Sequence, residues 1–164
     1  MIVKKLFVAT LHMDDNNFNM NFEACQPVGE MLVITEIYNL IIKDSLFSDF
    51  TVEKILDFSL TKDFIALLNS IGNFECKFHL YETEKSHFTF AIEKHKGEPD
   101  TLHYILVVGL LIAHLIKTRI DYSEDRIDEL KEEVINTVEG MIKERIVISS
   151  NYSQENPLDL KMVN

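Results

Sequence analysis

The chain contains few of the residues that define several specialised classes of protein. Among its 164 residues there are two cysteines, three prolines, five glycines and no tryptophan. Cys25 and Cys76 form no CxxC pair and are too few for a disulfide scaffold. Reduced thiols of this kind are typical of cytoplasmic proteins, and we expect the chain to be cytoplasmic.

Sequence motifs for catalysis or ligand binding are absent as well. The chain has no P-loop, dinucleotide fingerprint, GxSxG, HExxH or EF-hand loop, and its glycines form no phosphate-binding loop. No two of the six histidines have HxH or HxxxH spacing. His103 and His114 are eleven residues apart, about 16 Å along a helix, which is too far to share a metal ion. We therefore predict no cofactor, no metal site and no enzymatic activity.

The composition is that of a globular protein. With 46% hydrophobic and 26% charged residues, a chain of this length buries a sizeable core. We expect one domain, residues 1–148, followed by a mobile tail, residues 149–164, in which hydrophobic periodicity is lost. The longest apolar run, Leu102–Ile116, is shorter than the roughly 20 residues of a membrane span, which predicts a buried helix and no membrane partner.

Two β-hairpins are predicted from alternating hydrophobicity. An apolar strand at Leu6–Leu11 and a half-buried strand at Phe18–Ala24 are joined by an Asp/Asn turn. Phe74–Tyr81 and His87–His95 both place apolar side chains on one face, so they form the second hairpin. One register satisfies three cross-strand pairs at once: Lys77–Glu93, Phe78–Ile92 and Glu75–His95.

Helices are predicted between and after the hairpins. Pro27 suits the first turn of a helix that continues to Ile42 and is buried on most of its circumference. The helix Thr101–Ile120 contains Gly109, which indicates close approach of another backbone. Other positions predict helix ends: Thr51, Thr61 and Ser123 as N-caps, and Gly72 as a C-terminal stop. The order ββαα-ββαα predicts an α+β fold, with two antiparallel hairpins in one sheet and four or five helices packed against it.

The net charge of −11 is unevenly distributed. Residues 14–63 carry −7 and residues 121–133 carry −5, which leaves +1 for the remainder. A field of this sign repels phosphates, so we expect neither nucleic acid nor an anionic membrane as a partner.

The acidic run that begins at Asp121 is unusual for a helix that only has to be stable. Like charges four residues apart destabilise a helix, and Glu124–Asp128, Asp128–Glu132 and Glu129–Glu133 are all pairs of this kind. The helix dipole accounts for acids in the first turn but not for those further along. The run is either the solvated face of a helix or a docking surface for a basic protein. The second interpretation predicts six partner-binding residues: Glu124, Asp125, Asp128, Glu129, Glu132 and Glu133.

The leading hypothesis for function is a small acidic protein-binding module that masks a basic partner. An immunity protein or antitoxin that neutralises a nuclease toxin has this character. Two alternatives stay open. One is a secretion-chaperone-like homodimer that binds an effector. The other is a small hydrolase with a dispersed site centred on Glu75, His79 and His95, near Glu93, where a carboxylate would hold the tautomer of a histidine base.

Overall fold

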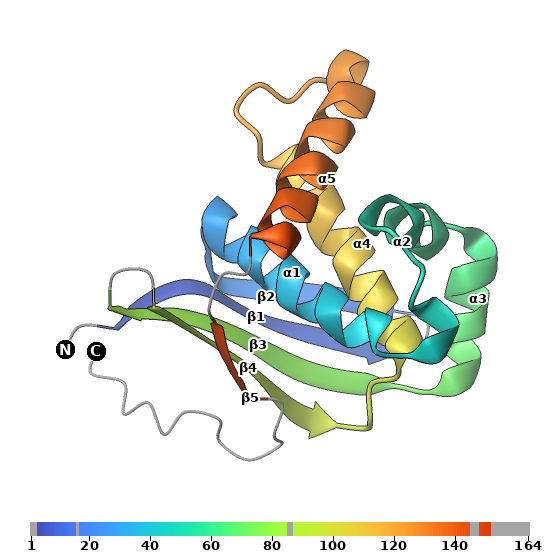
Figure 1. Cartoon of the computed structure of the whole chain (residues 1–164). Helices are drawn as coiled ribbons and strands as arrows, with labels where there is room; N and C mark the ends of the chain where they lie inside the picture. The colour runs from blue at the N-terminus through green and yellow to red at the C-terminus, as the bar shows by residue number, and fades with distance from the viewer. Residues whose placement is uncertain (1–2, 16, 85–86, 145–147, 152–164) are drawn as a thin grey trace. The chain divides into compact units, whose positions relative to one another are not determined.

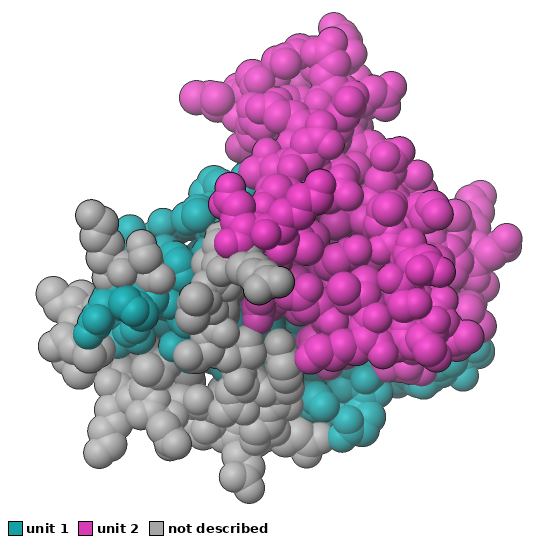
Figure 2. All heavy atoms as spheres, in the orientation of Figure 1, with its two compact units in different colours: residues 1–33, 69–99, 146–164 teal, residues 34–68, 100–145 magenta. Residues whose placement is uncertain are grey.

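A computed structural model describes residues 3–15, 17–84, 87–144 and 148–151. It has an α+β fold with five α-helices and a five-stranded sheet, in agreement with the predicted class (Figure 1). The chain divides into two compact units (Figure 2). The first contains residues 1–33, 69–99 and 146–164, and the second contains residues 34–68 and 100–145. That residues 1–148 form one domain stays a prediction.

The first unit contains the sheet, in the strand order β2-β1-β3-β4-β5. Both predicted hairpins are present and antiparallel, and β1 joins them by pairing antiparallel with β3. The strands are β1 (Lys4–Asp14), β2 (Asn17–Cys25), β3 (Phe74–Glu84), β4 (His87–Lys96) and β5 (Ile148–Asn151).

The register of the second hairpin is the predicted one over most of its length. Lys77 lies opposite Glu93, and Phe78 lies opposite Ile92. The third predicted pair is wrong, because Glu75 lies opposite Lys96 rather than His95. The register shifts between Glu75 and the next residue, and an extra residue at a bulge of this kind displaces every pair beyond it.

Strand β5 was not predicted. It pairs parallel with β4, from Phe88 opposite Ile148 to Ala91 opposite Asn151. A strand of four residues is too short to show an alternating pattern, so the predicted tail includes residues 149–151. The rest of the predicted tail, residues 152–164, lies outside the described residues.

The second unit is helical. It contains most of α1 and α3, together with α2, α4, α5 and two 3-10 turns. The helices are α1 (Pro27–Ile42), α2 (Val52–Ser59), α3 (Lys62–Ile71), α4 (Thr101–Lys117) and α5 (Ile127–Lys143), and the turns are η1 (Ser45–Phe47) and η2 (Glu124–Arg126).

Three of the four predicted helix ends are confirmed. The Thr51 hydroxyl accepts a hydrogen bond from the Lys54 amide at 3.2 Å, and Thr61 accepts from Phe64 at the same distance. Gly72 follows α3 with a φ of 111°, the left-handed conformation that lets glycine end a helix.

The fourth prediction, Ser123 as the cap of the last helix, is wrong. Ser123 makes no side-chain capping hydrogen bond, and the 3-10 turn η2 lies between it and α5. Arg126 occupies the N-cap position of α5 instead. The acidic residues Glu124 and Asp125 therefore lie in this turn rather than in the helix.

Helix α4 is buried along its centre, as its apolar sequence predicts. A Cβ atom added at Gly109 would overlap the Ser59 hydroxyl and lie 2.7 Å from the Ser59 Cβ. The predicted close approach is therefore present: the nearest neighbour is the Ser59 side chain at the end of α2, and the Leu56 Cα lies 3.9 Å from the added atom. Among the described residues, no helix is long and apolar enough to cross a membrane.

Candidate functional site

Four acids of the run, Asp128, Glu129, Glu132 and Glu133, lie on the exposed side of the amphipathic helix α5. Leu130, Val134 and Val138 recur at intervals of four residues along α5 and are buried. The intervening acids are exposed, so their charges are available either to neighbouring side chains or to a partner.

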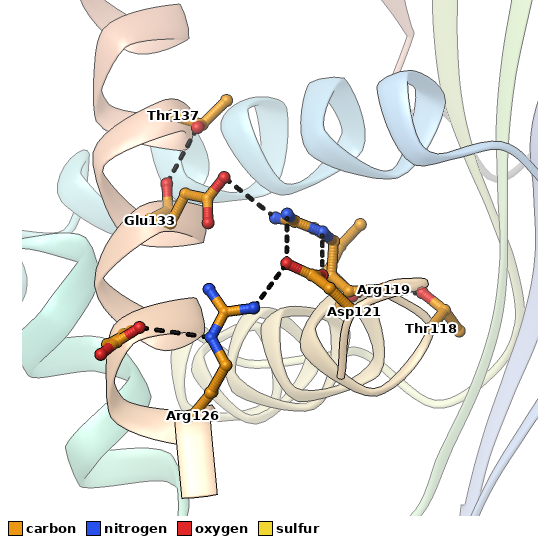
Figure 3. Close-up of polar contacts among 8 residues, drawn as sticks. Thr118, Arg119, Asp121, Arg126, Glu133 and Thr137 are labelled. Carbon is orange, nitrogen blue, oxygen red and sulfur yellow. Dashed lines mark hydrogen bonds and ion pairs between the residues drawn. The ribbon is translucent and has the colours of Figure 1, made fainter. Parts of the chain in front are cut away.

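Two arginines form ion pairs with three of the seven acids in the run. Arg126 contacts Asp121 at 2.9 Å and Glu129 at 3.3 Å. Arg119 contacts Asp121 at 3.4 Å and Glu133 at 3.3 Å. Figure 3 shows Asp121 between the two guanidinium groups, with Glu133 reaching Arg119 from α5. The hydrogen bond from Arg126 lowers the pKa of Asp121 and raises that of Arg126.

This network changes the interpretation of the like-charged pairs. Glu129 and Glu133 were predicted to bind a partner, but each has an arginine within 4 Å that offsets the repulsion between them. They hold η2 and the preceding loop against α5. Within the described part of the chain, Asp128 and Glu132 have no ion pair, and neither have Glu124 and Asp125.

Asp128 and Glu132 line a groove between α2 and α5. Its volume is about 430 Å³, and its lining residues are Glu53, Asp128, Lys131, Glu132, Ile135 and Asn136. Glu53 lies in the first turn of α2. Asp128 and Glu132 are four residues apart on α5 and so share the face that borders the groove.

Lys131, which lines the groove, is already paired with an acidic side chain. Lys131 donates a hydrogen bond to Asp57 of α2 at 2.8 Å. This hydrogen bond raises the pKa of Lys131, and the nearby charges of Glu53 and Asp128 contribute to the rise. Lys131 therefore stays protonated, with its ammonium group directed at Asp57.

Three carboxylates of the groove, those of Glu53, Asp128 and Glu132, have no ion-pair partner among the residues that the structure describes. Together with Asp57 they set four negative charges against one ammonium. A guanidinium group carries five N–H donors and an ammonium group three, and both are suited to such a site. The arrangement favours binding of a cation.

The sequence predicted only part of this site. Asp128 and Glu132 were among its candidates, whereas Glu53 and Asp57 were not. These two residues precede α5 by seventy positions or more in the sequence, and the only signal for them was their place in the acidic region of residues 14–63.

Of the residues of the hydrolase hypothesis, Glu75 lies apart from the other three. Glu75 lies beside His12, with 3.0 Å between its carboxylate and Nδ1. It is four residues from His79 along β3, which corresponds to about 13 Å. Glu93 instead contacts both His79, at 3.4 Å, and His95, at 3.7 Å.

His79 is buried and lies within hydrogen-bonding distance of a neighbouring side chain. It is 3% exposed, and its Nδ1 lies 2.9 Å from the Tyr81 hydroxyl. Burial is the main cause that lowers its pKa, Lys77 lowers it further, and Glu93 acts in the opposite direction. A general base has to reach its substrate, and so little exposure does not offer that access.

His103 and the two cysteines are also hydrogen-bonded or buried within the fold. His103 accepts a hydrogen bond from the Asp100 amide at 2.9 Å and so caps α4. The Cys25 thiol donates to Glu30 at 3.0 Å, and burial together with this carboxylate raises its pKa. Burial raises the pKa of Cys76 to about 12. Both cysteines are free thiols, and at neutral pH neither is a thiolate nucleophile.

Comparisons with protein-family models, with curated proteins and with solved structures find no match to this chain. Because no relative indicates a function, we base the proposed function on the groove between α2 and α5.

Proposed function

We propose that this chain is an acidic protein-binding module that holds a basic segment of a partner protein in the groove between α2 and α5. The observation that carries the proposal is the convergence of Glu53, Asp128 and Glu132 on one groove with no ion pair among the described residues. Like-charged side chains held together in this way cost stability, and a partner's cation would relieve the cost.

The charge of the whole helical unit supports this function. Residues 34–68 and 100–145 contain sixteen acidic residues against nine lysines and arginines, which gives −7 of the total −11. A field of one sign attracts a basic protein and accelerates association by 10- to 1,000-fold, depending on salt. It also rejects acidic partners.

The partner class that fits best is a nuclease toxin, and the chain would then be its cytoplasmic immunity protein or antitoxin. A nuclease binds phosphates through clustered lysines and arginines. Carboxylates spaced along a groove can occupy the same cationic groups and so exclude the nucleic acid. This inhibition requires no catalytic residue in the inhibitor, in keeping with the lack of catalytic motifs.

The test is inhibition of a basic nuclease encoded beside this chain, measured with a fluorogenic RNA or DNA substrate. The groove variant is Glu53→Gln/Asp128→Asn/Glu132→Gln. Its matched control, Asp49→Asn/Asp63→Asn/Glu144→Gln, removes three exposed acids of the same unit elsewhere. We expect the groove variant to inhibit at least about tenfold more weakly at low salt and the control to change by less than about threefold.

Two outcomes contradict the proposal. In the first, wild-type protein fails to inhibit any basic nuclease encoded beside it. In the second, the groove variant and the control inhibit equally well, which would show that the groove is not the contact surface.

A further inference from the structure

A second hollow lies beside the acidic groove, and it is apolar. Its volume is about 120 Å³, and its walls are almost wholly apolar. The lining residues belong to the same unit: Leu56 of α2 and Leu60 directly after it, Ala113, Ile116 and Lys117 of α4, and Ile127 and Lys131 of α5. Leu60 is 55% exposed and Ile127 is 43% exposed, so apolar surface at this site faces solvent.

Lys131 belongs to both hollows. Its ion pair with Asp57 links α2 to α5, and its side chain borders the acidic groove and also the apolar pocket. The two hollows are therefore adjacent, and a single bound segment would contact both.

We propose that the apolar pocket receives one aliphatic side chain of the same basic segment whose cationic side chain occupies the acidic groove. This inference rests on the proposed function and specifies the ligand: a peptide segment in which a lysine or arginine and an aliphatic residue lie close together. An apolar anchor in a pocket with polar contacts around its rim is a common arrangement in protein interfaces.

The charges around the two hollows fix which side chain enters which. Lys117 borders the apolar pocket and repels a cation there, and no acidic residue among those the structure describes lines this pocket. Glu53, Asp128 and Glu132 border the groove and attract one. The segment is thus bound in one direction, with its cation on the far side of Lys131 from its aliphatic anchor.

The size of the pocket limits the anchor to one side chain. An apolar cavity of about 150 Å³ accommodates a benzene molecule. A pocket of 120 Å³ accordingly suits a leucine, isoleucine or valine side chain. Burying such a group strengthens binding by roughly tenfold or more.

The probes are synthetic peptides with an Arg-Arg pair followed by one leucine at spacings of one to seven residues, in a Gly/Ser background. Each has a twin with serine in place of leucine. Fluorescence anisotropy measures their binding to wild-type protein, to the pocket variant Leu60→Ser/Ile127→Ser, and to the control Leu46→Ser/Ile120→Ser. The control residues are also exposed and lie outside both hollows.

We expect the leucine peptide to bind wild-type protein at least about tenfold more tightly than its serine twin at one spacing or two adjacent spacings. The pocket variant should lose this gain and keep the arginine-dependent affinity, and the control should keep both. The Glu53→Gln/Asp128→Asn/Glu132→Gln variant should lose the arginine-dependent affinity.

Equal binding of leucine and serine peptides at every spacing overturns this inference and leaves the proposed function standing. Binding of no peptide to wild-type protein overturns both. A stable dimer in light scattering that the Leu60→Ser/Ile127→Ser variant dissociates would assign the pocket to a second copy of this chain and also overturns the inference.

Discussion

At the scale of single residues, Arg119 and Arg126 divide the acids of α5 into those that are ion-paired and those that we propose for partner binding. Glu132 and Glu133 are neighbours on α5, yet among the described residues only Glu133 has an arginine, Arg119, at 3.3 Å. Glu132 instead shares the groove with Asp128, its like-charged neighbour one turn earlier.

The two glutamates should therefore respond oppositely to neutralisation. Glu132→Gln should raise the free energy of unfolding by a few tenths of a kcal/mol, because it removes a like-charge pair. Glu133→Gln should lower it by a similar amount, because it removes a solvent-exposed ion pair of modest strength. Urea denaturation at low ionic strength measures both, and a change of the same sign in the two variants would contradict the assignment.

His79 should make stability depend on pH. Burial holds its pKa below the 6.5 of a free histidine. As pH falls below 6.5, His79 takes up a proton in the unfolded chain but not in the folded chain. The contribution of neutral His79 to the free energy of unfolding is therefore fully present above pH 6.5 and declines below it. His79→Gln should reduce the loss of stability between pH 7.5 and 5.5, measured by urea denaturation.

The exposed His87 offers a matched control for this prediction. His87→Gln should retain the pH dependence of the wild-type protein over the same range. If His79→Gln loses as much stability as the wild type on acidification, His79 is not the group responsible.

At the scale of elements, the contact between α2 and α4 depends on Gly109. Gly109→Ala improves helix propensity by about 1 kcal/mol. It also places a methyl group against the Ser59 side chain, and overpacking of this kind costs about 1–3 kcal/mol. We expect net destabilisation, which Ser59→Gly in the same chain should partly relieve because it removes both clashing atoms.

A double-mutant cycle of Gly109→Ala and Ser59→Gly measures this contact directly. Thermal or urea unfolding should give a favourable coupling energy of at least about 1 kcal/mol. Additive effects of the two substitutions would show that α2 and α4 do not meet at this point.

The elements that could be predicted from the sequence are those with strong local patterns. Strict alternation in β3 and β4 fixed the pairing of Lys77 with Glu93, whereas the bulge next to Glu75 has no counterpart in the hydrophobic pattern. Strand β5 is too short to show a period. The Arg126 cap of α5 was missed because its side chain makes no capping hydrogen bond of the kind that favours serine.

The candidate site was predictable only on its α5 side. Charge spacing along one helix singled out Asp128 and Glu132, because residues four apart in a helix are neighbours by geometry. The contributions of Glu53, Asp57 and Leu60 depend on how α2 packs beside α5, and no pattern within either helix specifies that packing.

At the scale of the whole molecule, the acidic charge has two separate roles. Part of it is neutralised locally, as by Arg119 and Arg126, and stabilises the fold. The remainder gives the helical unit a net negative field in which the groove between α2 and α5 is the place where acids converge from two helices. This division of the charge is the central claim about function.

The most direct test of this claim is an NMR titration of ¹⁵N-labelled protein with a capped hexa-arginine peptide at low salt. The largest amide shift changes should fall on residues 52–57 and 128–136, and added salt should abolish them, since screening is effective beyond about 8 Å at physiological ionic strength. Shift changes spread evenly over all acidic regions, or centred on residues 14–30, would contradict the account.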